Sequence, residues 1–135
     1  MFCREAAAQL RRHQSEIEEE GAGIVAIGTG NRQFAAAFVR DEAIRFPVLI
    51  DDRAEAAKAI ELGRTSALGL LRPSVIAGRR RAAAAGHSQK RLGERPMQLG
   101  ATLVIGRGGE VLYSHMDSDV ADHAPIEDVL AALRQ

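Results

Sequence analysis

Three short apolar runs and one alternating run constrain the fold of this chain more than any other feature. The apolar runs lie at residues 23–28, 46–50 and 101–105, and the alternating run lies at residues 110–115. Such runs are typical of strands, and the first indicates a strand buried on both faces, as in a parallel sheet. The second run has Pro47 near its start, which an edge strand tolerates.

Helical patterns surround these runs. Asn31 is a suitable N-cap for the second helix, and either Asp51 or Asp52 could cap the third. The alternation of helices and strands predicts an α/β fold with a mixed sheet. Amphipathic spacing predicts one helix over residues 4–20 and further helices around residues 34–39, 54–62, 73–86 and 125–133.

The last third of the chain predicts a β-hairpin. Residues 101–105 and 110–115 form its strands, residues 107–109 form its turn, and an acidic loop follows over residues 117–123. The segment between residues 64 and 100 has the weakest pattern, and residues 87–96 are polar and loop-like.

Composition and charge exclude several classes of protein. The chain has 135 residues, of which 46% are apolar and 27% charged, which fits a single globular domain over residues 1–135. The 18 basic and 18 acidic residues cancel, which argues against a nucleic-acid binder. No apolar run is long enough to cross a membrane, and no secretory signal pattern is present, so cytoplasm is the expected compartment.

A single cysteine, Cys3, stands at the start of the first predicted helix. One cysteine excludes an internal disulfide framework and a cysteine-rich zinc site. Helix amides and the neighbouring Arg4 would both lower the pKa of this thiol, which makes Cys3 a candidate nucleophile. Glu5 could hold Arg4 or relay a proton. The alternatives are an incidental terminal thiol and a glutamate that only complements the helix dipole.

Three other patterns favour structural interpretations. The acidic and histidine residues of the loop match no zinc spacing, and Asp122 fits better at the start of the last helix. Residues 29–31 could hold a phosphate but read more simply as a strand-to-helix turn. A basic cluster could dock an anionic ligand or nucleic acid but more simply forms a solvated helix face. The loop residues are His115, Asp117, Asp119, Asp122 and His123, and the basic cluster is Arg79, Arg80 and Arg81 with Arg72, Lys90 and Arg91 nearby.

The order of these elements, with a cysteine opening the first helix, resembles the thioredoxin fold. More specifically, the chain resembles the alkyl hydroperoxide reductase/thiol-specific antioxidant (AhpC/TSA) family, in its peroxiredoxin-like branch with a Cys-x-x-Cys-Arg-Glu motif. The stretches that carry the resemblance are residues 3–5, 24–28, 46–51, 98–105 and 109–113.

The sequence departs from the family pattern in three places. The first cysteine of the motif would fall just before Met1, and Arg95 is the nearest arginine before the strand at residues 101–105, where the family keeps one closer. The family also places a central strand before the cysteine helix, between the strands matching residues 24–28 and 101–105. We therefore expect an N-terminally truncated thioredoxin-like domain, with helices flanking the sheet and unpaired edges on both neighbouring strands.

The resemblance implies a thiol-based oxidoreductase that reduces peroxides or disulfides. Cys3 would be the redox residue, Arg4 its electrostatic partner and Glu5 a third member of the site. No metal or nucleotide cofactor is implied, and a chain with one cysteine would need an external thiol as reductant. The alternative is a catalytically silent module whose exposed sheet edges form a homodimer or bind a partner.

Overall fold

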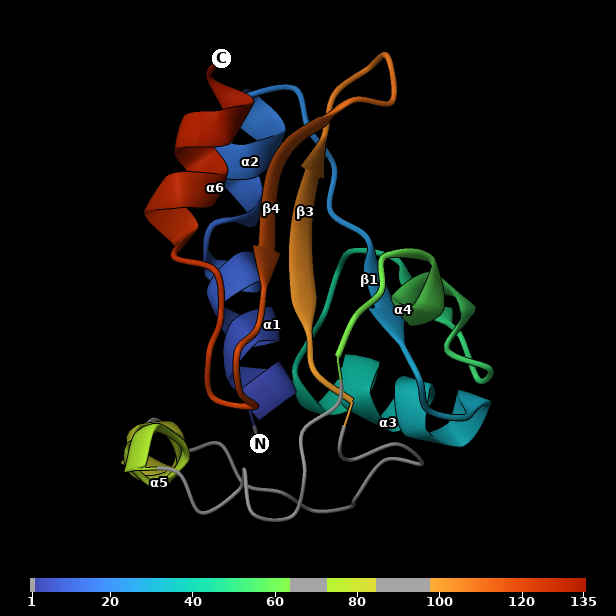
Figure 1. The fold of residues 1–135 in the computed structure, drawn as a ribbon, viewed down its shortest axis with the longest axis vertical. Helices are drawn as coiled ribbons and strands as arrows, with labels where there is room; N and C mark the ends of the chain where they lie inside the picture. The colour runs from blue at the N-terminus through green and yellow to red at the C-terminus, as the bar shows by residue number, and fades with distance from the viewer. Residues whose placement is uncertain (1, 64–72, 85–97) are drawn as a thin grey trace.

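The computed structural model describes residues 2–63, 73–84 and 98–135 (Figure 1). It contains helices and two small sheets, which confirms the α/β class. The helices are α1 (Phe2–Arg12), α2 (Gln14–Glu19), α3 (Arg32–Asp41), α4 (Glu55–Ala59), α5 (Pro73–Ala84) and α6 (Ile126–Leu133), and the strands are β1 (Ala26–Gly28), β2 (Val48–Ile50), β3 (Ala101–Ile105) and β4 (Val111–Met116).

The four strands form two separate pairs. β1 runs parallel to β2, with Ala26 opposite Val48. β3 runs antiparallel to β4, with Val104 opposite Tyr113, as the predicted hairpin requires. Among the described residues, no strand joins β1 to β3, so both strands keep one edge without a strand partner.

Two clusters of buried side chains hold these elements together. The first contains Ile17 of α2, Val104 of β3 and four residues of α6, which packs against the hairpin (Figure 1). The second contains Ala7 of α1 with Ile44 and Phe46, which follow α3. Leu10 and Ile24 pack against both clusters, so α1 and the segment before β1 connect the two halves of the core.

β1 is shorter and far more exposed than the sequence predicts. It covers Ala26–Gly28 instead of residues 23–28, and the side chains of Val25 and Ile27 are 56% and 55% exposed. The expectation of burial on both faces is therefore wrong. The physical reason is the width of the sheet, because a two-stranded pair gives these side chains few neighbours to pack against.

The first helix is also not continuous. It divides at His13, whose φ of −102° and ψ of 10° lie outside the helical range. The His13 amide lies within hydrogen-bond distance of the carbonyls of both Gln9 and Leu10, which marks a locally irregular turn. The division lets α1 pack Ala7 into one cluster while α2 packs Ile17 into the other.

Two predicted helix caps are confirmed. The Asn31 carboxamide oxygen accepts a hydrogen bond of 2.9 Å from the Phe34 amide at the start of α3. The Asp51 carboxylate accepts bonds of 2.8 Å from the amides of Glu55 and Ala56, so Asp51 caps the start of α4. α4 is nevertheless shorter than the predicted 54–62, and its N-cap residue, Ala54, has a positive φ of 54°.

The weakly patterned segment contains one described helix. α5 begins at Pro73, as predicted from the tolerance of proline in a first helical turn. The predicted loop at residues 87–96, together with Arg72, Lys90, Arg91 and Arg95, lies outside the described residues.

Replacing the α4 cap tests this local structure. Asp51→Ala removes two acceptors of backbone N–H groups, and we expect the free energy of unfolding to fall by about 1 kcal/mol. The neighbouring exposed Arg53 provides a matched control, Arg53→Ala, which should change it by less than about 0.5 kcal/mol. Urea unfolding followed by circular dichroism measures both values. Equal effects of the two substitutions would show that Asp51 does not act as a cap.

Candidate functional site

Cys3 is the second residue of α1, so its backbone lies in the first turn of that helix. This is the position at which unpaired helix amides favour a thiolate. Side chains of α1 are described from Arg4 onward.

Arg4 is anchored to the end of α3. Its Nη1 lies 2.5 Å from Glu42 Oε1, and its Nη2 lies 3.7 Å from Asp41 Oδ2. Its guanidinium carbon also stands 5.9 Å from the centre of the Phe38 ring, which is within the range of a cation–π contact. The Arg4 side chain is only 11% exposed.

These partners change what Arg4 can contribute to the thiol. Two carboxylates offset much of the positive charge that a neighbouring arginine would otherwise present to Cys3. Arg4 therefore acts first as an anchor that fixes the start of α1 against α3. Its effect on Cys3 depends on the balance between its own charge and the charges of Asp41 and Glu42.

Glu5 is directed toward α5. Its Oε1 accepts a hydrogen bond of 2.9 Å from Nε of Arg81, one of the arginines of the predicted basic cluster. Its Oε2 is buried and has no hydrogen-bond partner among the described residues. Arg79 and Arg80 are exposed, as a solvated helix face requires. Arg81 instead joins α5 to the first turns of α1.

An open pocket of about 480 Å³ lies beside this pair. It is bounded by α1, by α5 and by the loop that precedes α6, so it adjoins the helix that carries Cys3. Its lining residues are Glu5, Gln9, Arg12, Arg81 and residues 121–125.

The loop before α6 contains a compact polar cluster. His115 Nε2 lies 3.2 Å from Asp122 Oδ1, and His123 Nδ1 lies 3.5 Å from Asp117 Oδ2. Asp117 is buried, and a Cβ atom on Gly100 would overlap its carboxylate, so the Asp117 side chain would have to shift if Gly100 were replaced. The cluster thus fixes the end of β4 to the loop.

Asp122 does not cap α6 as the sequence suggests. The N-cap residue of α6 is Pro125, which makes no side-chain cap, while Asp122 Oδ2 accepts bonds of 2.8 and 2.9 Å from the Ser118 amide and hydroxyl. Burial alone would raise the pKa of Asp122. The two bonds from Ser118 and the nearby His115 outweigh burial and hold that pKa below its usual value.

Asp119 connects the same loop to α5. Its Oδ2 accepts a hydrogen bond of 2.5 Å from the Ser74 hydroxyl, and its Oδ1 accepts one of 2.8 Å from the Ala121 amide. Only 6% of Asp119 is exposed. The acidic loop is therefore a structural connection between α5, β4 and α6.

The described residues contain no group of three or more His, Cys, Asp and Glu side chains that could hold a metal ion. The turn at residues 29–31 serves α3 through the Asn31 cap. No helix in the described part of the chain is long and apolar enough to span a membrane.

The family model for AhpC/TSA antioxidant enzymes matches residues 9–119. The matched span begins after Cys3, Arg4 and Glu5, so it leaves the chemistry of these three residues untested. No curated protein matches the chain.

Sequence reasoning missed the partners of the candidate residues. Glu42 lies 38 positions from Arg4, and Arg81 lies 76 positions from Glu5. Contacts between residues so far apart along the chain leave no periodic signal in the sequence. The one available hint was the local concentration of charge at residues 40–42 and 79–81.

The lowered pKa of Asp122 predicts an acid-sensitive contribution to stability. A carboxyl whose pKa is lower in the folded state stabilises the protein above its unfolded pKa, and this contribution is lost as pH falls through the folded pKa. The Asp122→Asn variant should therefore have a lower free energy of unfolding than the parent protein at pH 7. This difference in free energy should become smaller in acid. Urea unfolding at pH 7 and pH 3 measures this difference, and Glu19→Gln on the exposed side of α2 is the control. A difference that is the same at both pH values would contradict the assignment.

Proposed function

Because the chain belongs to the AhpC/TSA antioxidant enzyme family, we propose that it is a thiol-based oxidoreductase in which Cys3 reduces peroxides. The observation that carries the proposal is the position of Cys3 in the first turn of α1. Helix amides at this position favour the thiolate, which is the reactive form of cysteine.

The proposed reaction has two stages. The Cys3 thiolate attacks one oxygen of a peroxide, an S–O bond forms, and the O–O bond breaks. The other oxygen of the peroxide takes up a proton and leaves as an alcohol or as water, and Cys3 becomes a sulfenic acid. An external thiol then attacks the sulfenic acid, water leaves, and a mixed disulfide with Cys3 forms. A second external thiol attacks this mixed disulfide, which releases the Cys3 thiolate and joins the two external thiols in a disulfide.

Arg4 and Glu5 are proposed as positioning residues at this site. Arg4 fixes the first turn of α1 through Glu42, and Glu5 fixes the same turn to α5 through Arg81. The pocket beside Glu5 offers a place for a small substrate or reductant to approach. We place the reaction in the cytoplasm, where thiol reductants are abundant.

Thiol reactivity measured across pH tests the proposal. When the alkylation rate of Cys3 is plotted against pH, its midpoint should lie below about pH 7.5, compared with about pH 8.5 for a free thiol. The urea-unfolded protein is the control, because unfolding removes the helix field while it keeps the same single cysteine. Coincident midpoints in the folded and unfolded protein would overturn activation of Cys3.

Two substitutions at the anchor should move this midpoint in opposite directions. Glu42→Gln keeps an oxygen that can accept from Arg4 but removes a negative charge, so the pKa of Cys3 should fall. Arg4→Gln removes a positive charge from the residue next to Cys3, so the pKa of Cys3 should rise. A purely structural disturbance would move both variants in one direction. Shifts of the same sign would therefore contradict an electrostatic role for Arg4.

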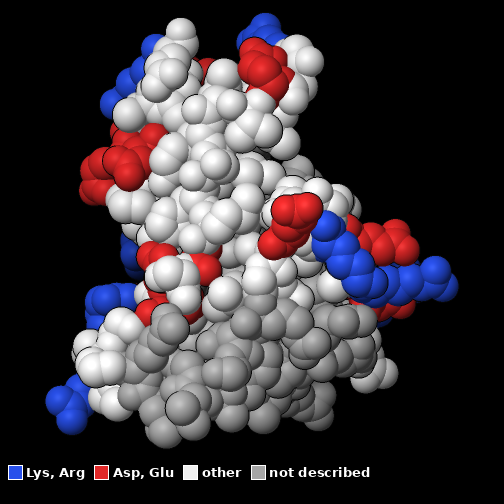
Figure 2. Space-filling model, viewed as in Figure 1, with Lys and Arg blue, Asp and Glu red and all other residues white. Residues whose placement is uncertain are grey.

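A second candidate function, a silent dimerisation module, is favoured by the exposed sheets. The Ala26 amide donates to Pro47 and the Gly28 carbonyl accepts from Asp51, the residues on either side of β2, so the peptide group of Ile27 between them turns toward the other edge of the pair. In the hairpin, the Gly100 carbonyl accepts from Asp117, and by the alternation of an antiparallel pair the peptide group of Leu103 turns toward the outer edge of β3. Unpaired edges of this kind can pair with another chain. In Figure 2 a largely uncharged band runs down the middle of the face seen in Figure 1.

The oligomeric state tests this alternative. If β1 pairs between copies, sedimentation should show a concentration-dependent dimer, and Ile27→Lys should shift it to monomer, since lysine discourages edge pairing. Ile76→Lys changes a similarly exposed residue on α5 and should leave the dimer intact. A monomer at every concentration would remove the alternative.

A further inference from the structure

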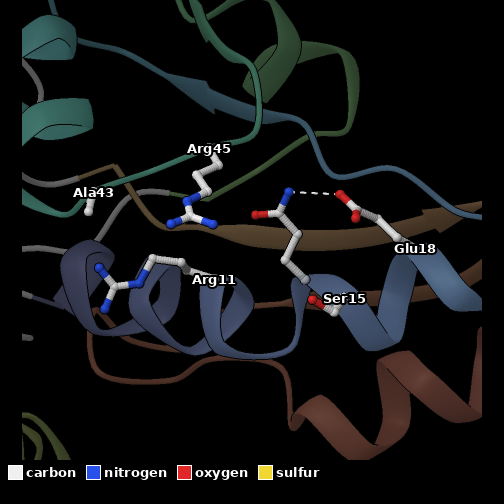
Figure 3. Close-up of a pocket in the computed structure, with 6 residues that line it drawn as sticks. Arg11, Ser15, Glu18, Ala43 and Arg45 are labelled. Carbon is white, nitrogen blue, oxygen red and sulfur yellow. Dashed lines mark hydrogen bonds between the residues drawn. The ribbon is translucent and has the colours of Figure 1, made fainter.

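A second open pocket, on the opposite end of α1 from Cys3, has no role in the proposed reaction. Its volume is about 370 Å³. Figure 3 shows Arg11 on α1, Arg45 on the segment that leads to β2, and Ser15 and Glu18 on α2 around the opening. The residues that line it are Arg11, Gln14, Ser15, Glu18, Ala43 and Arg45.

The two arginines of this pocket, Arg11 and Arg45, differ from the arginines that form structural ion pairs. Arg4, Arg81 and Arg134 each face a carboxylate. Arg11 instead donates from Nη1 to the backbone carbonyl of Glu42 at 2.5 Å, and a carbonyl carries no net charge to offset the guanidinium. Arg45 makes no ion pair with any described carboxylate, although it is the second cation of the same pocket.

The pocket therefore has a surplus of positive charge. Among the described residues, Glu18 is the only carboxylate that lines it, and its Oε1 already accepts a hydrogen bond of 2.7 Å from Gln14 Nε2. Arg11 is held in place by the carbonyl of Glu42, so part of the entropy of ordering this side chain has already been lost. A preordered arginine binds an anion at a lower entropic cost than a free one.

We propose that this pocket binds a small oxyanion with at least two acceptor oxygens, held between the guanidinium groups of Arg11 and Arg45. Guanidinium N–H groups match the oxygens of phosphate and carboxylate, and the Ser15 hydroxyl adds a further donor. The ligand chemistry is that of a polyphosphate or a polycarboxylate. Such a ligand would connect α1 to the segment between α3 and β2 and would stabilise the folded chain.

Isothermal titration with inorganic pyrophosphate and with citrate, each at constant ionic strength, tests the proposal. We expect saturable binding of one ligand per chain. Arg45→Gln should weaken it by about tenfold, because one charged donor group is lost. Arg53→Gln removes an equally exposed arginine outside the pocket and should leave the affinity unchanged. Thermal unfolding of both variants without ligand checks that they are folded.

The outcomes separate the possible ligands. Binding of pyrophosphate alone supports a phosphorylated ligand, binding of citrate alone supports a polycarboxylate, and binding of both supports a general oxyanion site. The absence of saturable binding at millimolar concentration would overturn the proposal. Equal weakening in Arg45→Gln and Arg53→Gln would also overturn it, because the attraction would then come from the surface as a whole.

Discussion

The contact of Glu42 with two arginines of α1 holds this helix against the end of α3. The Glu42 carboxylate accepts from Arg4 and its backbone carbonyl accepts from Arg11, so one residue at the end of α3 holds α1 at two points. The carbonyl is one of those that a helix C-terminus leaves without an internal partner, so its bond to Arg11 also satisfies α3. The same residue fixes the first turn of α1, whose backbone includes Cys3, and offsets the charge of Arg4.

Opposite ends of α1 therefore serve different purposes. At its first turn, the charge of Arg4 is largely offset by carboxylates, and Glu5 pairs with Arg81. At its last turn, Arg11 donates to a backbone carbonyl, faces no carboxylate of the described residues, and shares a pocket with Arg45. The first end suits a residue that needs a fixed position, and the second suits the binding of an external anion. The exposed sheets add a third surface, on which the side chains of Ile27, Leu49 and Ile105 are exposed.

Sequence patterns predicted the local structure best. The hairpin, the cap at Asn31 and the start of α5 at Pro73 follow from short-range rules of turn and helix chemistry, and the structure confirms them. The exposure of Ile27 could not be predicted, because it depends on which elements cover a strand and not on the strand itself. The partner of Arg4 was equally hidden, since an ion pair between residues 38 positions apart leaves no periodic signal.

The central claim is that Cys3 is an activated redox residue, and the most direct measurement is trapping of its sulfenic acid. The native protein is treated with an equimolar peroxide in the presence of a diketone that captures sulfenic acids, and mass spectrometry follows the adduct on Cys3 with time. The account predicts that the adduct forms faster in the folded protein than in the urea-unfolded protein at the same pH. Equal rates, or an adduct only in the unfolded protein, would contradict it.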